Sequence, residues 1–388
     1  MIATKQQLTR FSLLQGLYWM YIATFAAFLV AMLSAQGVPA DKLGIMVSVM
    51  TIGSCIGQFV VANLSDRLSD CKHVFLIFLS ITHVLHLLLF FTTNTVVLYI
   101  LMFVVGFSRL PLGAILDTWF IKGVSDSMRT FGQCRSWGSI GYAVTALLFG
   151  SVVSAIGYAV MPIMSTTVFV VLFILAFKTP DIEHIITDRK KGANSDSMRK
   201  LIPASLILLF VGATFAGGSN SAYNNMLPVI VASLGGTTAH QGIMMFVNAS
   251  MEVPAMNIPW ERLKISITMR IIISAVLFII SMFIMSFATN VWQIVLLMAV
   301  TGMAYGMHLQ ARRGMVAELS PRALQSTMHG IGDMLYSGFS PIITNVLSGY
   351  IIVFSGVRLM LQFCVLLHIL ALISYLFILA KQKKAIVQ

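Results

Sequence analysis

The chain has 388 residues, of which 58% are hydrophobic and only 10% are charged, and its mean hydropathy is +0.91. Soluble domains carry about 25% charged residues, so the composition excludes a soluble globular protein and indicates an integral membrane protein. Spans of about 20 residues joined by short loops allow roughly a dozen transmembrane helices in this length. The net charge of +12 raises the question of a nucleic-acid partner, which the positions of the basic residues answer below.

Twelve apolar segments are predicted to form the transmembrane helices. They lie near residues 8–34, 41–62, 73–92, 95–121, 132–155, 158–178, 200–232, 239–259, 264–288, 291–318, 323–352 and 356–380. The only long polar segment, 179–199, follows the sixth and has the composition of a flexible linker. We therefore expect an all-α membrane protein with two six-helix bundles, formed by residues 1–178 and 200–388. The first segment lacks a small-residue cleavage site, so we interpret it as a retained helix rather than a signal peptide.

Basic residues are distributed unevenly between the loops. All but four of the 25 Lys and Arg residues are predicted on the side that carries both termini, the linker and the loops after even-numbered helices. The exceptions are Lys42 and Arg358 on the other side, and Arg109 and Arg135 in or near spans. Because cytoplasmic loops carry an excess of Lys and Arg, we expect a multi-pass protein of the plasma membrane with both termini cytoplasmic. The basic excess then reflects topology, and we expect no nucleic-acid partner.

The stretch from Asp117 to Tyr142 places opposite charges on two consecutive helices. Asp117 lies near the end of the fourth predicted helix, and Arg135 opens the fifth. An unpaired charge in the membrane costs roughly 2.5–3.5 kcal/mol on insertion scales, so each of these residues needs a partner. Tyr142 is seven residues after Arg135 and shares its helix face. A carboxylate, a guanidinium and an aromatic ring together are typical of a polar ligand site, and an ion pair that ties two helices together is the alternative.

The loop after the second helix, ANLSDRLSDCKH, carries charges that can bridge neighbouring helix ends. Asp66, Arg67 and Lys72 resemble the charged positions of the signature loop of the major facilitator superfamily, Gly-x-x-x-Asp-(Arg/Lys)-x-Gly-x-(Arg/Lys)-(Arg/Lys). Together with twelve spans and a central linker, this resemblance implies the major facilitator fold and a gating role for the loop. The departures from the pattern are Ala62, Ser69 and Asp70.

The stretch FGQCRSWGSIGYA, with an acid 18 residues before its arginine, narrows the resemblance. It is similar to the lactose permease-like branch of proton-coupled sugar, nucleoside and aromatic-acid symporters, and the opening QGVPADKLGIM agrees. The resemblance implies that Asp117 and Arg135 bind the substrate and that Tyr142 stacks on its ring. That branch carries a tryptophan at the stacking position. Its proton-coupling Lys, His and Glu of the tenth helix are replaced here by a segment that offers His308, so the proton route must differ.

Further polar residues lie inside the predicted spans of helices 4 and 7. Arg109 lies deep in the fourth helix, two residues before Pro111, and we expect it to face the substrate pathway or to pair with another helix. The seventh helix reads GGSNSAYNNMLP, and its glycines and proline favour an interrupted helix. Asn220, Tyr223 and Asn224 provide uncharged donors and acceptors there, which suit sugar hydroxyls or a heterocycle.

Helices 8 and 11 contain the candidates for proton coupling, alongside His308. Glu252 lies near the middle of the eighth predicted span without a basic neighbour in sequence, and desolvation there favours the protonated acid that a proton carrier needs. His329 and Asp333 are four residues apart on the eleventh helix and share a face. A buried His and Asp can hold one proton between them. The alternatives are a neutral acid bonded to a neighbouring helix and a packed polar seam.

No catalytic motif occurs in the sequence, and no phosphate-binding loop supports ATP-driven transport by this chain. The four cysteines lack metal-ligand spacing, so we expect no disulfide, metal or cofactor. We interpret the chain as a secondary transporter, and the resemblance implies proton-coupled symport of a small polar solute, with a sugar or oligosaccharide as the first class. Nucleoside or aromatic-acid symport and drug export are the alternatives within transport, and a membrane-embedded enzyme or a sensor lies outside it. We expect a monomer with the solute, protons and lipid as its partners.

Overall fold

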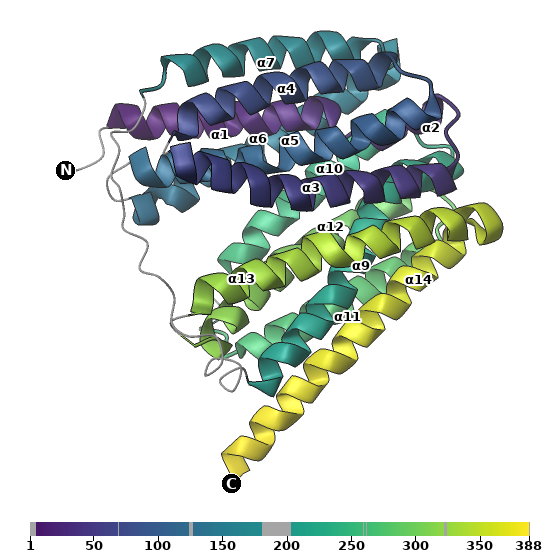
Figure 1. Cartoon of the computed structure of the whole chain (residues 1–388). Helices are drawn as coiled ribbons and strands as arrows, with labels where there is room; N and C mark the ends of the chain where they lie inside the picture. Colours follow the sequence, from purple (N-terminus) through teal and green to yellow (C-terminus); the bar gives the residue numbers. More distant parts are fainter. Residues whose placement is uncertain are drawn as a thin grey trace. The chain divides into compact units, whose positions relative to one another are not determined.

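The structure is a computed structural model that describes residues 5–68, 70–123, 127–180, 203–258, 260, 262–321 and 324–387. These residues are helical almost throughout, and all twelve predicted segments contain helix (Figure 1). Ten stretches of the described chain are long and apolar enough to cross a membrane. The last of them, Thr327–Gln382, holds two predicted helices. The helix Thr238–Asn257 is not among the ten, because polar residues such as Gln241 and Glu252 lower its hydropathy.

The chain divides into two compact units. The first comprises Met1–Val38, Ile45–Asp188 and Thr237–Phe246, and the second comprises Pro39–Gly44, Arg189–Gly236 and Val247–Gln388. The predicted linker at 179–199 lies outside the described residues from residue 181 onward. The domain boundaries 1–178 and 200–388 therefore stay a prediction.

The helices of the N-terminal half run in both directions past one another, with α4 beside α7 and α1 against α6 (Figure 1). Their bounds are α1 Lys5–Phe25, α2 Leu29–Ala35, α3 Ala40–Leu68, α4 Cys71–Phe91, α5 Thr95–Gly123, α6 Ser127–Ile156 and α7 Val160–Lys178.

The C-terminal half contains the longest helical stretch, and α9 packs along it. The bounds here are α9 Ala204–Ser233, α10 Thr238–Asn257, α11 Ile267–Met285, α12 Val291–Leu319, α13 Gln325–Met334, the π-helix η3 Leu335–Phe339 and α14 Ser340–Val387.

Local chemistry explains where the helices start and stop. The first predicted span breaks into α1 and α2 close to Thr24, whose hydroxyl donates to the carbonyl of Tyr21 at 2.7 Å; such side-chain bonds compete with the helical backbone and bend helices. Asn290 and Gln293 form a capping box at the start of α12. Gly356 has φ +83° and ψ 169°, a left-handed conformation that only glycine adopts without strain. It divides α14 into the two helices that the sequence predicts.

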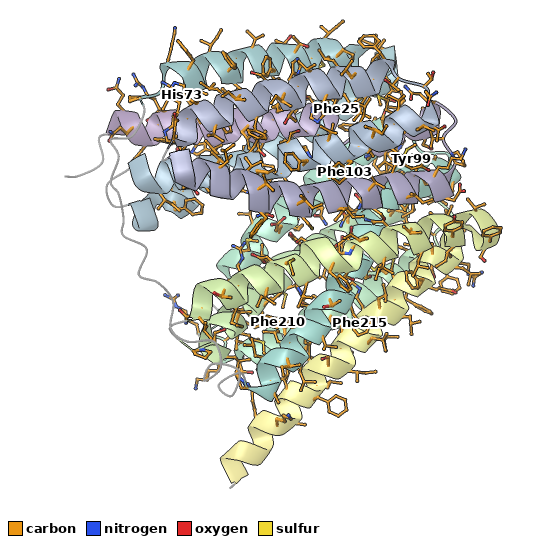
Figure 2. The ribbon with its side chains drawn as sticks, in the orientation of Figure 1. Phe25, His73, Tyr99, Phe103, Phe210 and Phe215 are labelled. Carbon is orange, nitrogen blue, oxygen red and sulfur yellow. The ribbon has the colours of Figure 1, made fainter. Side chains whose placement is uncertain are left out.

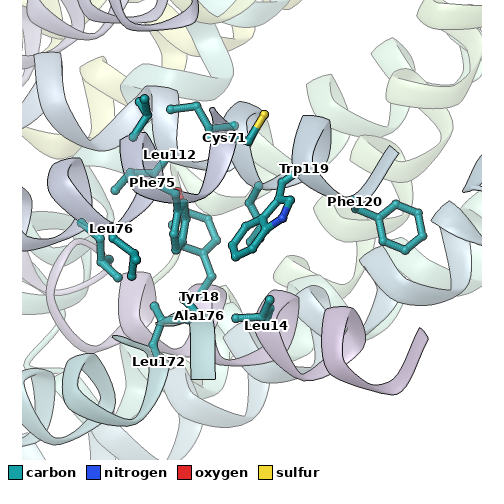
Figure 3. Close-up of a cluster of buried hydrophobic side chains, with 14 of the residues drawn as sticks. Leu14, Tyr18, Cys71, Phe75, Leu76, Leu112, Trp119, Phe120, Leu172 and Ala176 are labelled. Carbon is teal, nitrogen blue, oxygen red and sulfur yellow. The ribbon is translucent and has the colours of Figure 1, made fainter. Parts of the chain in front are cut away.

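The core of the first unit is rich in aromatic residues. Tyr18 of α1 packs against Phe75 of α4, and Trp119 of α5 contacts the same phenylalanine (Figure 3). Leu172 and Ala176 contribute from α7. Figure 2 shows apolar side chains projecting from the helices throughout, among them Phe103 on α5 and Phe215 on α9. This distribution suits helices that contact protein on one side and lipid on the other.

The contact between α9 and the helix η3–α14 includes a row of polar groups between Gly217 and Asn225, and we call this part of the contact the α9 seam. Gly217 lies so close to the backbone of Tyr336 that a Cβ at this position would be 2.1 Å from the Tyr336 carbonyl oxygen. Thr344 donates to the Gly218 carbonyl at 3.0 Å, and both Ser221 and Asn225 donate to the side chain of Asn345. The glycines of this region therefore serve close packing, and α9 is continuous through them and Pro228 rather than interrupted as predicted.

Candidate functional site

A residue of α1 forms a hydrogen bond with Asp117, the acid of the predicted substrate site. Gln15 is buried, and its Nε2 donates a 2.7 Å hydrogen bond to Oδ1 of Asp117 on α5. Asp117 is half-buried. A primary amide such as that of Gln15 donates to a carboxylate without carrying a charge of its own, and a carboxylate has several acceptor positions. Asp117 can therefore accept hydrogen bonds from a bound solute.

A second residue of α1, Trp19, contacts the arginine of the predicted site. The Cζ of Arg135 on α6 lies 4.4 Å from the centroid of the Trp19 ring, and this ring contacts Tyr142 edge to face at 6.3 Å. Arg135, Trp19 and Tyr142 are each half-buried. Gln15 and Trp19 are four residues apart, so one face of α1 presents a partner to each of the two charged residues.

Tyr18 connects these residues with Arg109. The phenol of Tyr18 is buried and lies within electrostatic range of Arg109, Asp117 and Arg135. The Nε of Arg109 is buried and has no hydrogen-bond partner among the described residues. We call this group the Tyr18 cluster; its members are Gln15, Tyr18, Trp19, Arg109, Asp117, Arg135 and Tyr142. The three predicted charged residues thus lie within electrostatic range of one tyrosine, while a direct contact between Asp117 and Arg135 stays a prediction.

A second polar group lies in the other unit around Tyr336, in the π-helix η3. Asn220 of α9 donates to the Tyr336 hydroxyl at 2.9 Å, and Asn224 donates to Asn220 at 2.8 Å. The His308 ring stacks on Tyr336 at 5.4 Å, and the Arg312 guanidinium lies 4.7 Å from the centroid of the same ring. π-Helical turns occur frequently at functional sites. We call this group the Tyr336 cluster; its members are Asn220, Asn224, His308, Arg312, Asp333 and Tyr336.

Asp333 has a different partner from the one expected. Its Oδ1 accepts a 2.7 Å hydrogen bond from Nη2 of Arg312, whereas we expected it to share a proton with His329. The side chain of Arg312 is only 4% exposed, and that of Asp333 is 48% exposed. The acid therefore compensates a buried cation on α12, and the expected buried His–Asp pair does not describe it. His329 is half-buried one turn away.

Two further predicted residues lie near the Tyr336 cluster. Glu252 of α10 is half-buried and within electrostatic range of Tyr336. Tyr223 was expected to bind substrate, but it is buried and its hydroxyl is directed at the sulfur of Met298 on α12. Tyr223 therefore fastens α9 to α12 inside the unit.

The signature loop is described only in part. The side chains of Asp66 and Arg67 lie outside the described residues. The Nζ of Lys72 lies 5.6 Å from the centroid of the Phe177 ring near the end of α7. Asp70, which departs from the family pattern, caps α4 by accepting from the backbone of His73 at 2.9 Å. This departure thus has a structural function at the start of α4.

Sequence reasoning missed Gln15 and Trp19 as members of the Tyr18 cluster. The available signal was a glutamine inside an apolar helix with a tryptophan one turn later, since a polar residue in a span needs a partner. It also missed the pairing of Arg312 with Asp333, because 21 positions and a turn separate the two residues.

Comparisons with known proteins agree with this architecture. A transporter named maltose permease from Geobacillus stearothermophilus is 22% identical over 274 residues, which are 69% of this chain and 68% of the relative. The uncharacterized transporter YwbF of Bacillus subtilis (strain 168) is 21% identical over 320 residues, 81% of this chain and 79% of its own. Among solved structures, a mutant form of the nucleoside transporter NupG has a TM-score of 0.80 at 16% identity, covering 97% of this chain and 99% of that one.

This fold defines a secondary transporter of the major facilitator superfamily, and the predicted fold class is confirmed. The profile of the MFS_1 like family matches residues 8–365, so the chain belongs to this family. It is accordingly a multi-pass membrane transporter of a small molecule and not an enzyme, as the sequence predicts.

Proposed function

We propose that the protein is a proton-coupled symporter that takes up a small solute with a hydroxylated ring, with sugars or oligosaccharides as the first class and nucleosides as the second. The observation that carries this proposal is the Tyr18 cluster. It brings together a carboxylate held by Gln15, a guanidinium held by Trp19 and the ring of Tyr142. These three chemistries complement a ring that has hydroxyl groups at its edge and an apolar face.

Each residue of the cluster has a defined part in this proposal. Asp117 accepts hydrogen bonds from solute hydroxyls, and the planar fork of Arg135 donates two bonds to neighbouring oxygens. Tyr142 offers its ring to the apolar face of the solute. Arg109 provides a compensating positive charge on α5, the helix that also carries Asp117. In the other unit Asn220 and Asn224 contribute uncharged amide groups, and Asp66, Arg67 and Lys72 act at the gating loop.

We assign proton coupling to acids or histidines of the C-terminal half. Glu252 remains the first candidate, because it is a half-buried carboxylate on α10. Asp333 is the second, since the buried charge of Arg312 depends on it. His308 and His329 are the remaining candidates. Alternating access of the two bundles would carry the solute across.

The relatives support both solute classes without deciding between them. The maltose permease is named for a disaccharide, and NupG is named for nucleosides. Sugars and nucleosides share a hydroxylated ring, which is the feature that the Tyr18 cluster suits. Because of the basic loops, we place both termini on the cytoplasmic side of the plasma membrane. We further propose that the protein acts as a monomer.

Counterflow in proteoliposomes tests the proposal. Vesicles loaded with unlabelled maltose or uridine should accumulate the corresponding labelled solute transiently, and vesicles without protein should not. An imposed inward proton gradient should then raise the accumulation of the solute that exchanges. Failure of sugars and nucleosides alike to exchange would contradict the proposed solute, and exchange that is insensitive to the proton gradient would contradict the coupling.

A further inference from the structure

We propose that Trp19 is the positioning residue of the transport site, and that Gly138 is the residue that makes this possible. This inference rests on the proposed function for its effect on the solute, but its structural part can be tested without any solute. In this arrangement Trp19 holds the Arg135 guanidinium in one orientation, so that its N–H groups point toward the solute. The aromatic partner of the arginine thus comes from α1 rather than from α6, which carries Tyr142.

The first step of the argument is the contact itself. The guanidinium carbon lies 4.4 Å from the Trp19 ring centroid, well inside the range of a cation–π interaction. Arg135 and Tyr142 share a face of α6, yet the ring of Tyr142 contacts Trp19 at 6.3 Å and 76°. Tyr18 contacts the same indole at 5.5 Å and 77°. The indole is therefore fixed by two edge-to-face contacts, and a fixed ring defines where the guanidinium lies.

The second step is the space that this contact requires. A Cβ at Gly138 would lie 2.4 Å from Cδ1 of Trp19 and 2.9 Å from Nη1 of Arg135. Any larger residue at this position would thus collide with both members of the pair. Gly141, one turn further, allows the backbones of α1 and α6 to approach, since a Cβ there would be 2.6 Å from the Gly16 carbonyl oxygen. Small residues are the usual means of such close helix packing in membranes.

The third step is the consequence for recognition. A guanidinium lying on an indole keeps its five N–H donors at the edge of its plane, available for oxygens. Held in one orientation, it loses less freedom when a solute binds, so more of each hydrogen bond contributes to affinity. Trp19 thereby determines which pairs of hydroxyl groups Arg135 can bind at once. Trp19 acts through Arg135 and does not need to touch the solute.

The solute-independent experiment measures the reaction of phenylglyoxal with arginines in the purified full-length protein, followed by mass spectrometry. Removal of the indole face in Trp19→Leu should make Arg135 react about three- to thirtyfold faster, the range that loss of a cation–π contact supports. Trp19→Phe should react like the wild type, and Gly138→Ala should react like Trp19→Leu. Combining Gly138→Ala with Trp19→Leu should add little, because both remove the same contact.

Two matched controls separate positioning from general loosening. Trp137 lies on α6 with 52% of its surface exposed, so Trp137→Leu makes the same chemical change away from the pair. Arg358 lies 4.3 Å from the Phe287 ring centroid in the other unit, so its reaction rate should not change in the Trp19 variants. An unchanged rate at Arg135 in Trp19→Leu, or equal acceleration at Arg135 and Arg358, would overturn the inference.

The solute arm uses maltose and uridine with the same variants. The dissociation constant of whichever probe binds the wild type should rise about three- to thirtyfold in Trp19→Leu and Gly138→Ala, and Trp19→Phe and Trp137→Leu should bind like the wild type. If neither probe binds the wild type, the proposed function fails while the phenylglyoxal result still decides the role of Trp19. Unchanged affinity in Trp19→Leu would overturn the role in recognition.

Discussion

Gln15 and Asp117 lie 102 positions apart in the sequence, and a 2.7 Å hydrogen bond joins their side chains. We expect Gln15→Leu to weaken solute binding about tenfold, because hydrogen bonds to charged groups contribute roughly 1.5–3 kcal/mol and Asp117 would lose a fixed donor. Isothermal titration with the solute that exchanges in counterflow measures this. Gln133→Leu is the matched control, since Gln133 is exposed on α6. Equal affinity in both variants would show that the bond does not orient the acid.

Arg135→Lys tests the planar fork. Lysine keeps the charge, but it presents a single ammonium group and cannot donate two parallel hydrogen bonds. We expect at least about a tenfold loss of affinity and of counterflow rate, since bidentate pairs are the strong ones. Arg358→Lys makes the same change at the other unit and should transport like the wild type. Normal transport by Arg135→Lys would show that Arg135 contributes only its positive charge and not two parallel hydrogen bonds.

Arg312 and Asp333 provide a stability test. Asp333→Asn leaves the guanidinium of Arg312, which is only 4% exposed, without its anion. Breaking a buried pair costs about 3–5 kcal/mol, and because Asp333 is 48% exposed we expect a smaller loss of about 2 kcal/mol. Thermal unfolding in detergent measures the loss. Adding Arg312→Met should restore much of the stability, since the neutral pair no longer buries a lone charge; a double variant less stable than Asp333→Asn would contradict this.

Glu252→Gln mimics the protonated acid. If Glu252 carries the proton, this variant should lose accumulation driven by a proton gradient and retain solute exchange. Glu318→Gln, at the exposed end of α12, should keep both activities. Full accumulation by Glu252→Gln would move the proton to Asp333 or the histidines. Loss of exchange together with accumulation would make Glu252 a ligand of the solute.

Cysteine labelling in intact cells tests the orientation. With Cys55 replaced by alanine, a cysteine at Ser195 in the predicted cytoplasmic linker should resist an impermeant maleimide. A cysteine at the exposed Thr93, in the turn between α4 and α5, should react from outside. If the chain inserts in the opposite direction, the cysteine at position 195 should react from outside and the cysteine at position 93 should resist.

Hydrophobic runs and turn residues predicted the helices well, because a membrane span must satisfy its backbone hydrogen-bonding groups within its own helix. They missed the break near Thr24 and the π-helix at Tyr336, which are small changes of backbone geometry inside apolar runs. Asp117 and Arg135 could be predicted, since a charge in a span stands out. The roles of Gln15 and Trp19 could not be predicted, because these residues reach Asp117 and Arg135 only through the packing of α1 against α5 and α6.

The α9 seam has a consequence for how the protein moves. Its hydrogen bonds follow one another along α9, from the buried bond at Gly218 to the partly buried bond at Asn225. Sliding α9 along its neighbour by one turn would break several of them at once without a replacement partner, so this helix pair should shift as one rigid piece. Deuterium uptake along Gly217–Asn225 should then stay slow in every stage of the transport cycle, and the hinges of the cycle should lie outside this pair.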